Sequence, residues 1–166
     1  MGRPLLFLDV DGPLIPFGGP PDWYPAYQEP AAGNPLLARV NPAHGPRLQK
    51  LGCELVWATA WEHHANSYVG PILGLPELDV VTWPEPSIVE AVYDEDLGLH
   101  WKTRALVRWA EGRPFAWIDD ELTEADQDWV ADNYPEDALL HRVNSVVGLR
   151  DTDYVTLSRW LSECGG

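Results

Sequence analysis

The feature that most constrains the fold is the stretch from Pro4 to Leu14, PLLFLDVDGPL. Its apolar run LLFL predicts a fully buried strand, and Gly12 with Pro13 predicts a turn after it. Asp9 and Asp11 follow the run, and because alternate residues of an extended chain point the same way, we expect both acids to leave on one side. A buried acid pair is costly without a partner. The pattern fits a metal or nucleophilic site, and it equally fits a strand that ends in a common Asp-Gly turn.

Length and composition indicate a single domain spanning residues 1–166. The chain has 166 residues, of which 45% are hydrophobic, and this is enough to bury a core. Its formal net charge of −15 repels polyanions, so nucleic acid is an unlikely partner and no membrane binding is expected. A small phosphorylated substrate is compatible with this charge, because one cation inside a pocket reverses the local potential. The plainest role of the acidity is solubility.

The two cysteines, Cys53 and Cys164, have no metal-ligand spacing, and we expect no disulfide framework. The apolar run before Asp9 is too short for a signal peptide or a membrane span. Leu6 stands where a myristoylation signal needs Ser or Thr. These observations predict a cytoplasmic protein.

Strand patterns alternate with helix patterns along the chain. After the first strand, we expect strands over residues 54–59, 78–83, 114–119 and 139–143, and helices over 41–51, 61–69, 102–111, 123–131 and 152–162. Residues 84–100 fit either a short helix or a strand. The alternation predicts an α/β protein with a three-layer, doubly wound, Rossmann-like fold and a central parallel sheet of about five strands.

Residues 13–36 are rich in Gly, Pro and aromatic residues, a composition typical of a long ordered loop. Loops of this length in a compact domain are often functional. The segment is therefore either a small lid or a surface insertion. Candidates to roof a site, for which packing or a solvated helix face is the plainer interpretation, are Trp23, Tyr24, Tyr27, Trp61, His63 and His64.

Parallel α/β sheets bind ligands at the carboxyl ends of their strands. The polar residues expected there, together with a lysine that opens a helix, are Asp9, Asp11, Thr59, Asp119, Asp120 and Lys102. The acids would make an oxygen-lined site suited to Mg²⁺. Thr59 and backbone amides after it, such as that of Ala60, would hold phosphoryl oxygens, and Lys102 would offset their charge. Taken alone, Thr59 also reads as a helix cap, Lys102 as a solvated lysine and the two later acids as a turn.

These motifs resemble those of the haloacid dehalogenase (HAD) superfamily of aspartate-nucleophile phosphohydrolases. The matches are LDVDG at 8–12, VWATA at 56–60, the lysine of HWKTR at 102, and WIDDE at 117–121. They follow the family's order and span residues 4 to about 150. One departure is Pro13, where the family usually has Thr or Val. Proline lacks an amide donor, so we expect the loop after Asp11 to differ in geometry.

The resemblance implies a magnesium-dependent phosphatase that hydrolyses a phosphomonoester through an aspartyl-phosphate. In the mechanism that the resemblance implies, Asp9 is the nucleophile, and Asp11 protonates the leaving oxygen and later activates water. The residues it assigns to Mg²⁺ are Asp9, Asp11 through its backbone carbonyl, and Asp119 with Asp120 beside it. The residues assigned to phosphate are Thr59, Ala60 and Lys102.

The segments between Asp11 and Thr59, and between Thr59 and Lys102, are too short for a full cap domain. We therefore expect an open site, or one covered only by the 13–36 loop. Capless relatives often act on large substrates or borrow a lid by oligomerising, which makes a homo-oligomer a candidate assembly. We expect a small or protein-borne phosphoester as substrate. Two alternatives stay open: a phosphotransferase that uses the same residues, and a binding or regulatory protein that keeps the fold without turnover.

Overall fold

The predicted parallel sheet lies at the centre of the molecule. The computed structural model describes residues 2–30 and 32–164. Its strands are β1 (Leu5–Leu8), β2 (Glu54–Trp57), β3 (Asp79–Val80), β4 (Phe115–Asp119) and β5 (Ala138–Arg142). They form a five-stranded sheet in the order β3-β2-β1-β4-β5, and every pair of neighbours is parallel.

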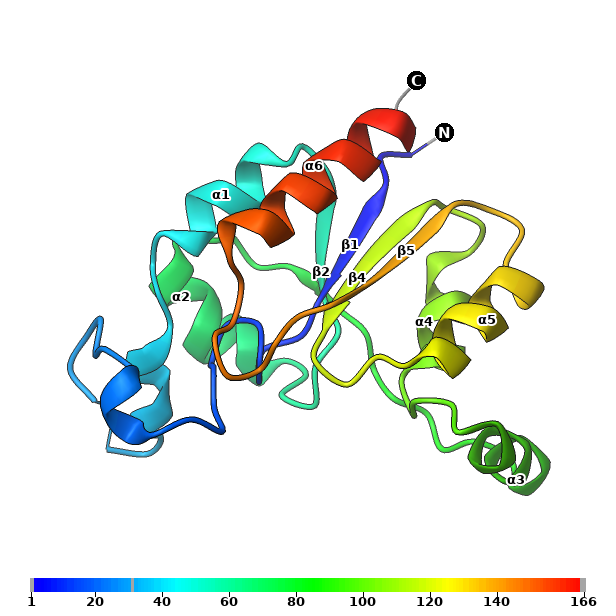
Figure 1. The fold of residues 1–166 in the computed structure, drawn as a ribbon, viewed down its shortest axis with the longest axis horizontal. Helices are drawn as coiled ribbons and strands as arrows, with labels where there is room; N and C mark the ends of the chain where they lie inside the picture. Colours follow the sequence, from blue (N-terminus) through cyan, green and yellow to red (C-terminus); the bar gives the residue numbers. More distant parts are fainter. Residues whose placement is uncertain (1, 31, 165–166) are drawn as a thin grey trace.

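Helices cover both faces of this sheet. They are α1 (His44–Lys50), α2 (Gly70–Leu73), α3 (Ile88–Leu97), α4 (Thr103–Ala110), α5 (Glu124–Asn133) and α6 (Asp151–Cys164). Figure 1 shows α1, α2 and α6 on one side of the sheet and α4 and α5 on the other. This is the doubly wound α/β architecture that the sequence predicts. No helix in the described ranges is long and apolar enough to cross a membrane.

β1 is buried on both faces because it lies in the middle of the sheet. Leu6 and Leu8 pack into the hydrophobic cluster that contains α1, α2 and α6 residues, whereas Leu5 and Phe7 pack into the cluster with α4 and α5 residues. All four side chains are fully buried. Side chains alternate between the faces of a sheet, so a strand covered on both sides must be apolar at every position. This explains the continuous LLFL run.

Three predicted elements differ from the structure in length or start. The strand expected over 78–83 forms only Asp79–Val80, which pair with Val56 and Trp57 of β2. The helix expected over 61–69 begins later, with a π-helical turn over Ala65–Val69 that continues into α2. The helix expected over 41–51 begins at His44, and Pro46 lies in its first turn, where no amide donor is needed.

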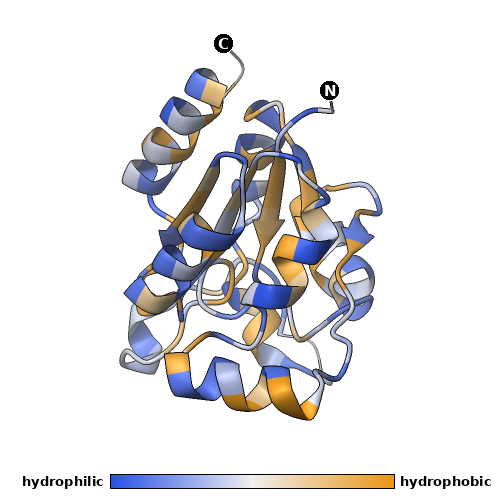
Figure 2. Cartoon of the chain, turned by 90° about the vertical axis from the view of Figure 1, so that its right-hand side faces the viewer, coloured by the Kyte–Doolittle hydropathy of each residue, from blue (hydrophilic) through white to orange (hydrophobic). Residues whose placement is uncertain are grey.

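The ambiguous segment 84–100 forms α3, which projects from the body of the protein (Figure 1). Ser87 caps its start, since the hydroxyl accepts from the Glu90 amide at 3.2 Å. None of its residues is buried, and Ile88 is 85% exposed. Figure 2 shows apolar residues in the strands and also on α3, where Ile88, Val89 and Val92 are exposed. Ion pairs from Arg104 and Arg108 of α4 to α3 acids hold the helix in place.

In its described residues, 13–30 and 32–36, the predicted loop has two short 3₁₀ turns, over Pro21–Trp23 and Pro35–Arg39, and an isolated bridge from Ile15 to Asp11. Its first part is tied to the rest of the fold through backbone bonds, because the Leu149 amide donates to the Pro13 carbonyl and the Phe17 amide donates to the Ser145 carbonyl. Leu14 and Ile15 donate their amides to the Val10 carbonyl. The turn after Asp11 thus closes without a donor at position 13, which explains how proline fits there.

Candidate active site

The carboxyl ends of β1, β2 and β4 meet at one edge of the sheet. Backbone pairing continues past the strands, since the Ala58 amide donates to the Leu8 carbonyl (2.8 Å) and the Asp9 amide donates to the Ile118 carbonyl (3.2 Å). Asp9 therefore lies between the residues that follow β2 and the end of β4. This register brings together the Asp9, Thr59 and Asp119 positions, as the sequence predicts.

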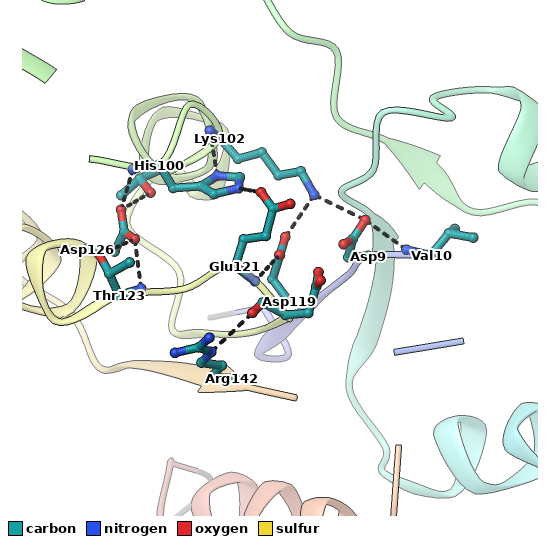
Figure 3. Close-up of polar contacts among 11 residues, drawn as sticks. Asp9, Val10, His100, Lys102, Asp119, Glu121, Thr123, Asp126 and Arg142 are labelled. Carbon is teal, nitrogen blue, oxygen red and sulfur yellow. Dashed lines mark hydrogen bonds and ion pairs between the residues drawn. The ribbon is translucent and has the colours of Figure 1, made fainter. Parts of the chain in front are cut away.

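Lys102 binds two of these acids at once (Figure 3). Its Nζ lies 3.1 Å from Asp9 Oδ1 and 2.8 Å from Asp119 Oδ2, and its side chain is only 4% exposed. Burial alone would lower the pKa of Lys102, but the carboxylates of Asp9 and Asp119 outweigh it and hold that pKa above its ordinary value. Lys102 is thus a buried ammonium, and the interpretation as a solvated lysine is wrong.

Asp9 is held by one of its two oxygens. Oδ1 accepts from the Val10 amide at 2.8 Å and from Lys102, whereas Oδ2 has no hydrogen-bond partner within residues 2–30 and 32–164. The pKa of Asp9 is raised to about 8, mainly by burial and in part by the nearby Asp119 carboxylate, against the lowering effect of Lys102. The carboxylate is therefore fixed in orientation and keeps one oxygen free.

Asp119 and Asp120 follow one another at the end of β4. Asp119 Oδ1 accepts from the Glu121 amide at 3.0 Å, so both of its oxygens are engaged. Burial raises the pKa of Asp120 to about 6, and the charge of Asp119 adds to the rise. A Cβ on Gly12, which has φ of +100°, would lie 2.7 Å from Asp120 Cγ. Glycine is thus required at position 12 by its backbone angle and by the space that Asp120 fills.

Carboxylates of Asp9, Asp119 and Asp120 form the one group in the described ranges that could hold a metal ion, with ligand oxygens all within 4.8 Å of one another. Hard oxygen donors of this kind suit Mg²⁺. Lys102 pairs with Asp9 and Asp119 of this group. Burial is the main cause of the raised pKa values of Asp9 and Asp120, and the charge of Asp119 adds to both. A divalent cation would favour the charged form of each carboxylate. The donor set fits magnesium.

Asp11 lies apart from this carboxylate group. β1 ends at Leu8, so both acids belong to the loop, and there Asp9 is buried whereas Asp11 is exposed. Asp11 Oδ2 accepts a hydrogen bond from Trp61 Nε1 at 3.0 Å. The side chain of Asp11 is therefore oriented by an aromatic residue from the turn after β2.

Thr59 is fully buried, and its hydroxyl accepts from the Trp61 amide at 3.2 Å. An oxygen that accepts one bond still carries a proton that it can donate. The Thr59 carbonyl accepts from Trp83 Nε1 at 3.0 Å, which anchors the turn from the other side. Ala60 follows on the exposed side of the turn. The turn thus combines a hydroxyl with a backbone amide, which is the pairing expected of a phosphate-binding turn, while Thr59 also acts as a local cap.

Two neighbours of Lys102, His100 and Trp101, were not predicted as site residues from the sequence. His100 Nδ1 accepts the Lys102 amide at 3.1 Å, and the His100 amide donates to Asp126 Oδ1 at 2.7 Å (Figure 3). Trp101 places its ring 5.4 Å from Lys102 Nζ. Both precede the lysine in the HWKTR motif. The sequence feature that could have predicted this contact is a histidine two residues before the lysine that opens the helix.

The aromatic residues of the 13–36 loop lie elsewhere. Trp23, Tyr24 and Tyr27 line a separate hollow of about 420 Å³ together with residues of α1 and of the 146–151 segment. Arg39 stacks on Tyr24 there, with its guanidinium carbon 4.3 Å from the ring centroid. His63 and His64 are exposed. Among the candidate roof residues, Trp61 is the one with a hydrogen bond to a predicted catalytic acid.

Comparison with known proteins identifies the family. Residues 5–154 match the family model described as "HAD domain in Swiss Army Knife RNA repair proteins". No curated protein and no solved structure matches the chain. The match covers nearly the whole chain, including every strand and every residue of the site above. It supports an enzyme of the phosphoesterase type in general, and it places the chain in the family of HAD domains that this model describes.

Proposed function

We propose that this protein is a magnesium-dependent phosphatase that hydrolyses a phosphomonoester through an aspartyl-phosphate on Asp9. The observation that carries the proposal is the state of Asp9, a buried carboxylate that Lys102 and the Val10 amide fix through Oδ1 while Oδ2 stays free. A nucleophile needs this combination of fixed orientation and one available oxygen. The match to a HAD family supports phosphoester chemistry.

In the first step, Asp9 Oδ2 attacks phosphorus in line with the ester bond. The new O–P bond forms as the bond to the ester oxygen breaks, and Asp11 gives its proton to the leaving oxygen. Lys102, the Thr59 hydroxyl and the Ala60 amide face the phosphoryl oxygens and offset their charge. The Trp61 bond to Asp11 keeps the acid directed toward the leaving group.

In the second step, Asp11 is a carboxylate and takes a proton from water. The water oxygen bonds to phosphorus, the bond to Asp9 breaks, and inorganic phosphate leaves. Both acids then return to their starting states. Magnesium, held by Asp9, Asp119, Asp120 and the Asp11 carbonyl, would neutralise charge on the transferred group.

The substrate class follows from the family and from the charge. The family description names RNA repair, and the terminal phosphate of an RNA strand is a phosphomonoester. The net charge of −15 makes nucleic acid an unlikely partner, because it opposes contacts along a nucleic-acid backbone; a strand end is a candidate on the family description alone. Small phosphoesters and strand ends are therefore the substrates to test first. The free thiols Cys53 and Cys164 fit a reducing compartment such as the cytoplasm.

The test is hydrolysis of several phosphomonoesters, with and without Mg²⁺, by the wild type and by Asp9→Asn. We expect metal-dependent turnover that Asp9→Asn abolishes, and Asp132→Asn, on the exposed surface of α5, serves as the matched control with unchanged turnover. Retained turnover in Asp9→Asn would contradict the assignment of the nucleophile. A folded, metal-loaded wild type that neither turns over nor traps a beryllofluoride mimic at Asp9 would overturn the phosphatase proposal.

A further inference from the structure

A second cavity contains Trp61, the residue that donates a hydrogen bond to Asp11. Its volume is about 480 Å³, and its lining residues are Gly33, Asn34, Leu37, Trp61, His64 and Tyr68. Trp61 and His64 belong to the turn after β2, and Tyr68 to the π-helical turn that follows it. Gly33 and Asn34 directly precede the Pro35–Arg39 turn, and Leu37 lies within it. Two segments thus line an open cavity, and one of them, the turn after β2, also carries Thr59.

Trp61 contacts both this cavity and the predicted catalytic acid Asp11. Its Nε1 donates to Asp11 Oδ2 at 3.0 Å, while its side chain forms part of the cavity lining. In the proposed mechanism, Asp11 protonates the leaving oxygen, so the leaving group lies next to Asp11. The remainder of the substrate then lies beside the indole, at the entrance of the cavity.

The lining selects a flat, uncharged group. Trp61, His64 and Tyr68 offer aromatic faces, and the rings of His64 and Tyr68 lie with centroids 6.0 Å apart. None of the lining residues is an acid, a lysine or an arginine. Asn34 Oδ1 accepts from the Leu36 amide, which leaves its NH₂ group to donate. Aromatic faces with a few polar groups are the surface on which nucleobases stack.

We propose that this cavity binds the nucleobase of one nucleoside monophosphate unit, whose phosphate occupies the site at Asp9. The proposal rests on the phosphatase function above and names its substrate class. The net charge of −15 restricts recognition to one nucleotide, since further phosphates are repelled. The unit is either a free mononucleotide or the end of an RNA strand.

The test compares nucleoside 5′-monophosphates with ribose 5-phosphate, which lacks only the base. We expect the wild type to prefer the nucleotide by about tenfold in kcat/KM, the size of one base stacked on an aromatic ring. Tyr68→Ala should reduce this preference toward unity and leave ribose 5-phosphate hydrolysis unchanged. Tyr93→Ala is the matched control, because Tyr93 on α3 is 53% exposed and Tyr68 is 54% exposed. Trp61→Phe should slow both substrates, since it keeps a ring and removes the bond to Asp11.

Equal kcat/KM for the two substrates in the wild type would overturn the proposal, as would a Tyr68→Ala variant that slows both alike. Failure of the phosphatase function is a separate outcome. If no phosphomonoester is hydrolysed, calorimetric binding of the same two ligands to Asp9→Asn still tests the cavity. Tighter binding of the nucleotide, lost in Asp9→Asn/Tyr68→Ala, supports base recognition, and equal binding refutes it.

A third comparison separates the two sources of the nucleotide. A short RNA carrying a terminal phosphate is assayed beside the mononucleotide at low and high salt. A strand end as substrate predicts RNA hydrolysis that rises with salt, because screening weakens repulsion from the acidic protein. A free nucleotide as substrate predicts that the mononucleotide is preferred at every salt concentration.

Discussion

Lys102 Nζ lies 3.1 Å from Asp9 Oδ1, at a point where neither side chain is more than a tenth exposed. The same ammonium also pairs with Asp119, so it compensates two buried carboxylates. Removing one partner of such a group is costly, because it leaves the other charges buried without compensation. This relationship makes Lys102 important for both stability and activity.

Lys102→Met is therefore expected to abolish turnover and to destabilise the metal-free protein by about 3–5 kcal/mol. The loss should be larger at pH 8 than at pH 5, because the pKa of Asp9 is raised to about 8, so this side chain is neutral at pH 5 and needs the ammonium only as it becomes charged at higher pH. Thermal unfolding at both pH values measures it. Lys50→Met, at the exposed end of α1, is the control, and an equal loss in both variants would refute the assignment.

Gly12→Ala is expected to weaken Mg²⁺ binding by displacing Asp120. The added Cβ would lie 2.7 Å from Asp120 Cγ, in addition to the strain of a positive φ. Gly52→Ala is a closely matched control, since Gly52 also has a positive φ, +74°, but nothing lies within 4 Å of its Cβ position. Titration calorimetry with Mg²⁺ should show a loss of affinity only for Gly12→Ala. If both variants bind Mg²⁺ like the wild type, Asp120 does not contribute to the metal site.

The metal affinity should rise with pH between about 6 and 8. The pKa of Asp9 is raised to about 8 and that of Asp120 to about 6, so protons compete with Mg²⁺ for these carboxylates below those values. A folded pKa above the unfolded one also means that the metal-free protein loses stability as pH rises from about 4 toward 8. The increase in Tm on adding Mg²⁺ should therefore be larger at pH 8 than at pH 6. A pH-independent increase would contradict these shifts.

His100 is expected to act by positioning Lys102. Its Nδ1 accepts the Lys102 amide at 3.1 Å, at the start of α4. His100→Ala removes this acceptor and should lower kcat with a smaller effect on KM, because the ammonium is then less well fixed toward the transferred phosphoryl group. His100→Asn, whose side-chain oxygen is able to accept the same amide, should recover part of the rate. If Asn and Ala variants are equally impaired, the hydrogen bond is not the cause.

Much of the sheet was predictable because burial on both faces imposes a continuous apolar pattern. The LLFL run predicted β1, and the PFAWID run predicted β4, which directly leads to Asp119 and Asp120. The helix predicted over 123–131 forms as α5, and at its start the Thr123 amide donates to Asp126 Oδ2. These features depend on local sequence, and each is confirmed.

The remaining features depend on tertiary contacts, which the sequence pattern does not show. Ile88 and Val89 of α3 are exposed. The apolar pattern that normally marks the buried face of a helix was therefore missing, and the sequence did not distinguish a helix from a strand over residues 84–100. β3 pairs with β2 over two residues only, although the apolar pattern of LDVVTW extends over six. The bond between Trp61 and Asp11 joins residues 50 positions apart in the chain, and only the assembled fold creates it.

The central place of β1 has a consequence for how the chain acquires its structure. Leu5–Leu8 pair with residues 54–57 on one side and 115–118 on the other. β1 is synthesised before both of its partners, about 50 and 110 residues ahead of them, and such distant pairing slows folding. Until β4 is added, one edge of an entirely apolar strand stays open to association with other chains. The same late step also brings Asp119 to Asp9, so an incomplete chain lacks both its finished sheet and its acid cluster.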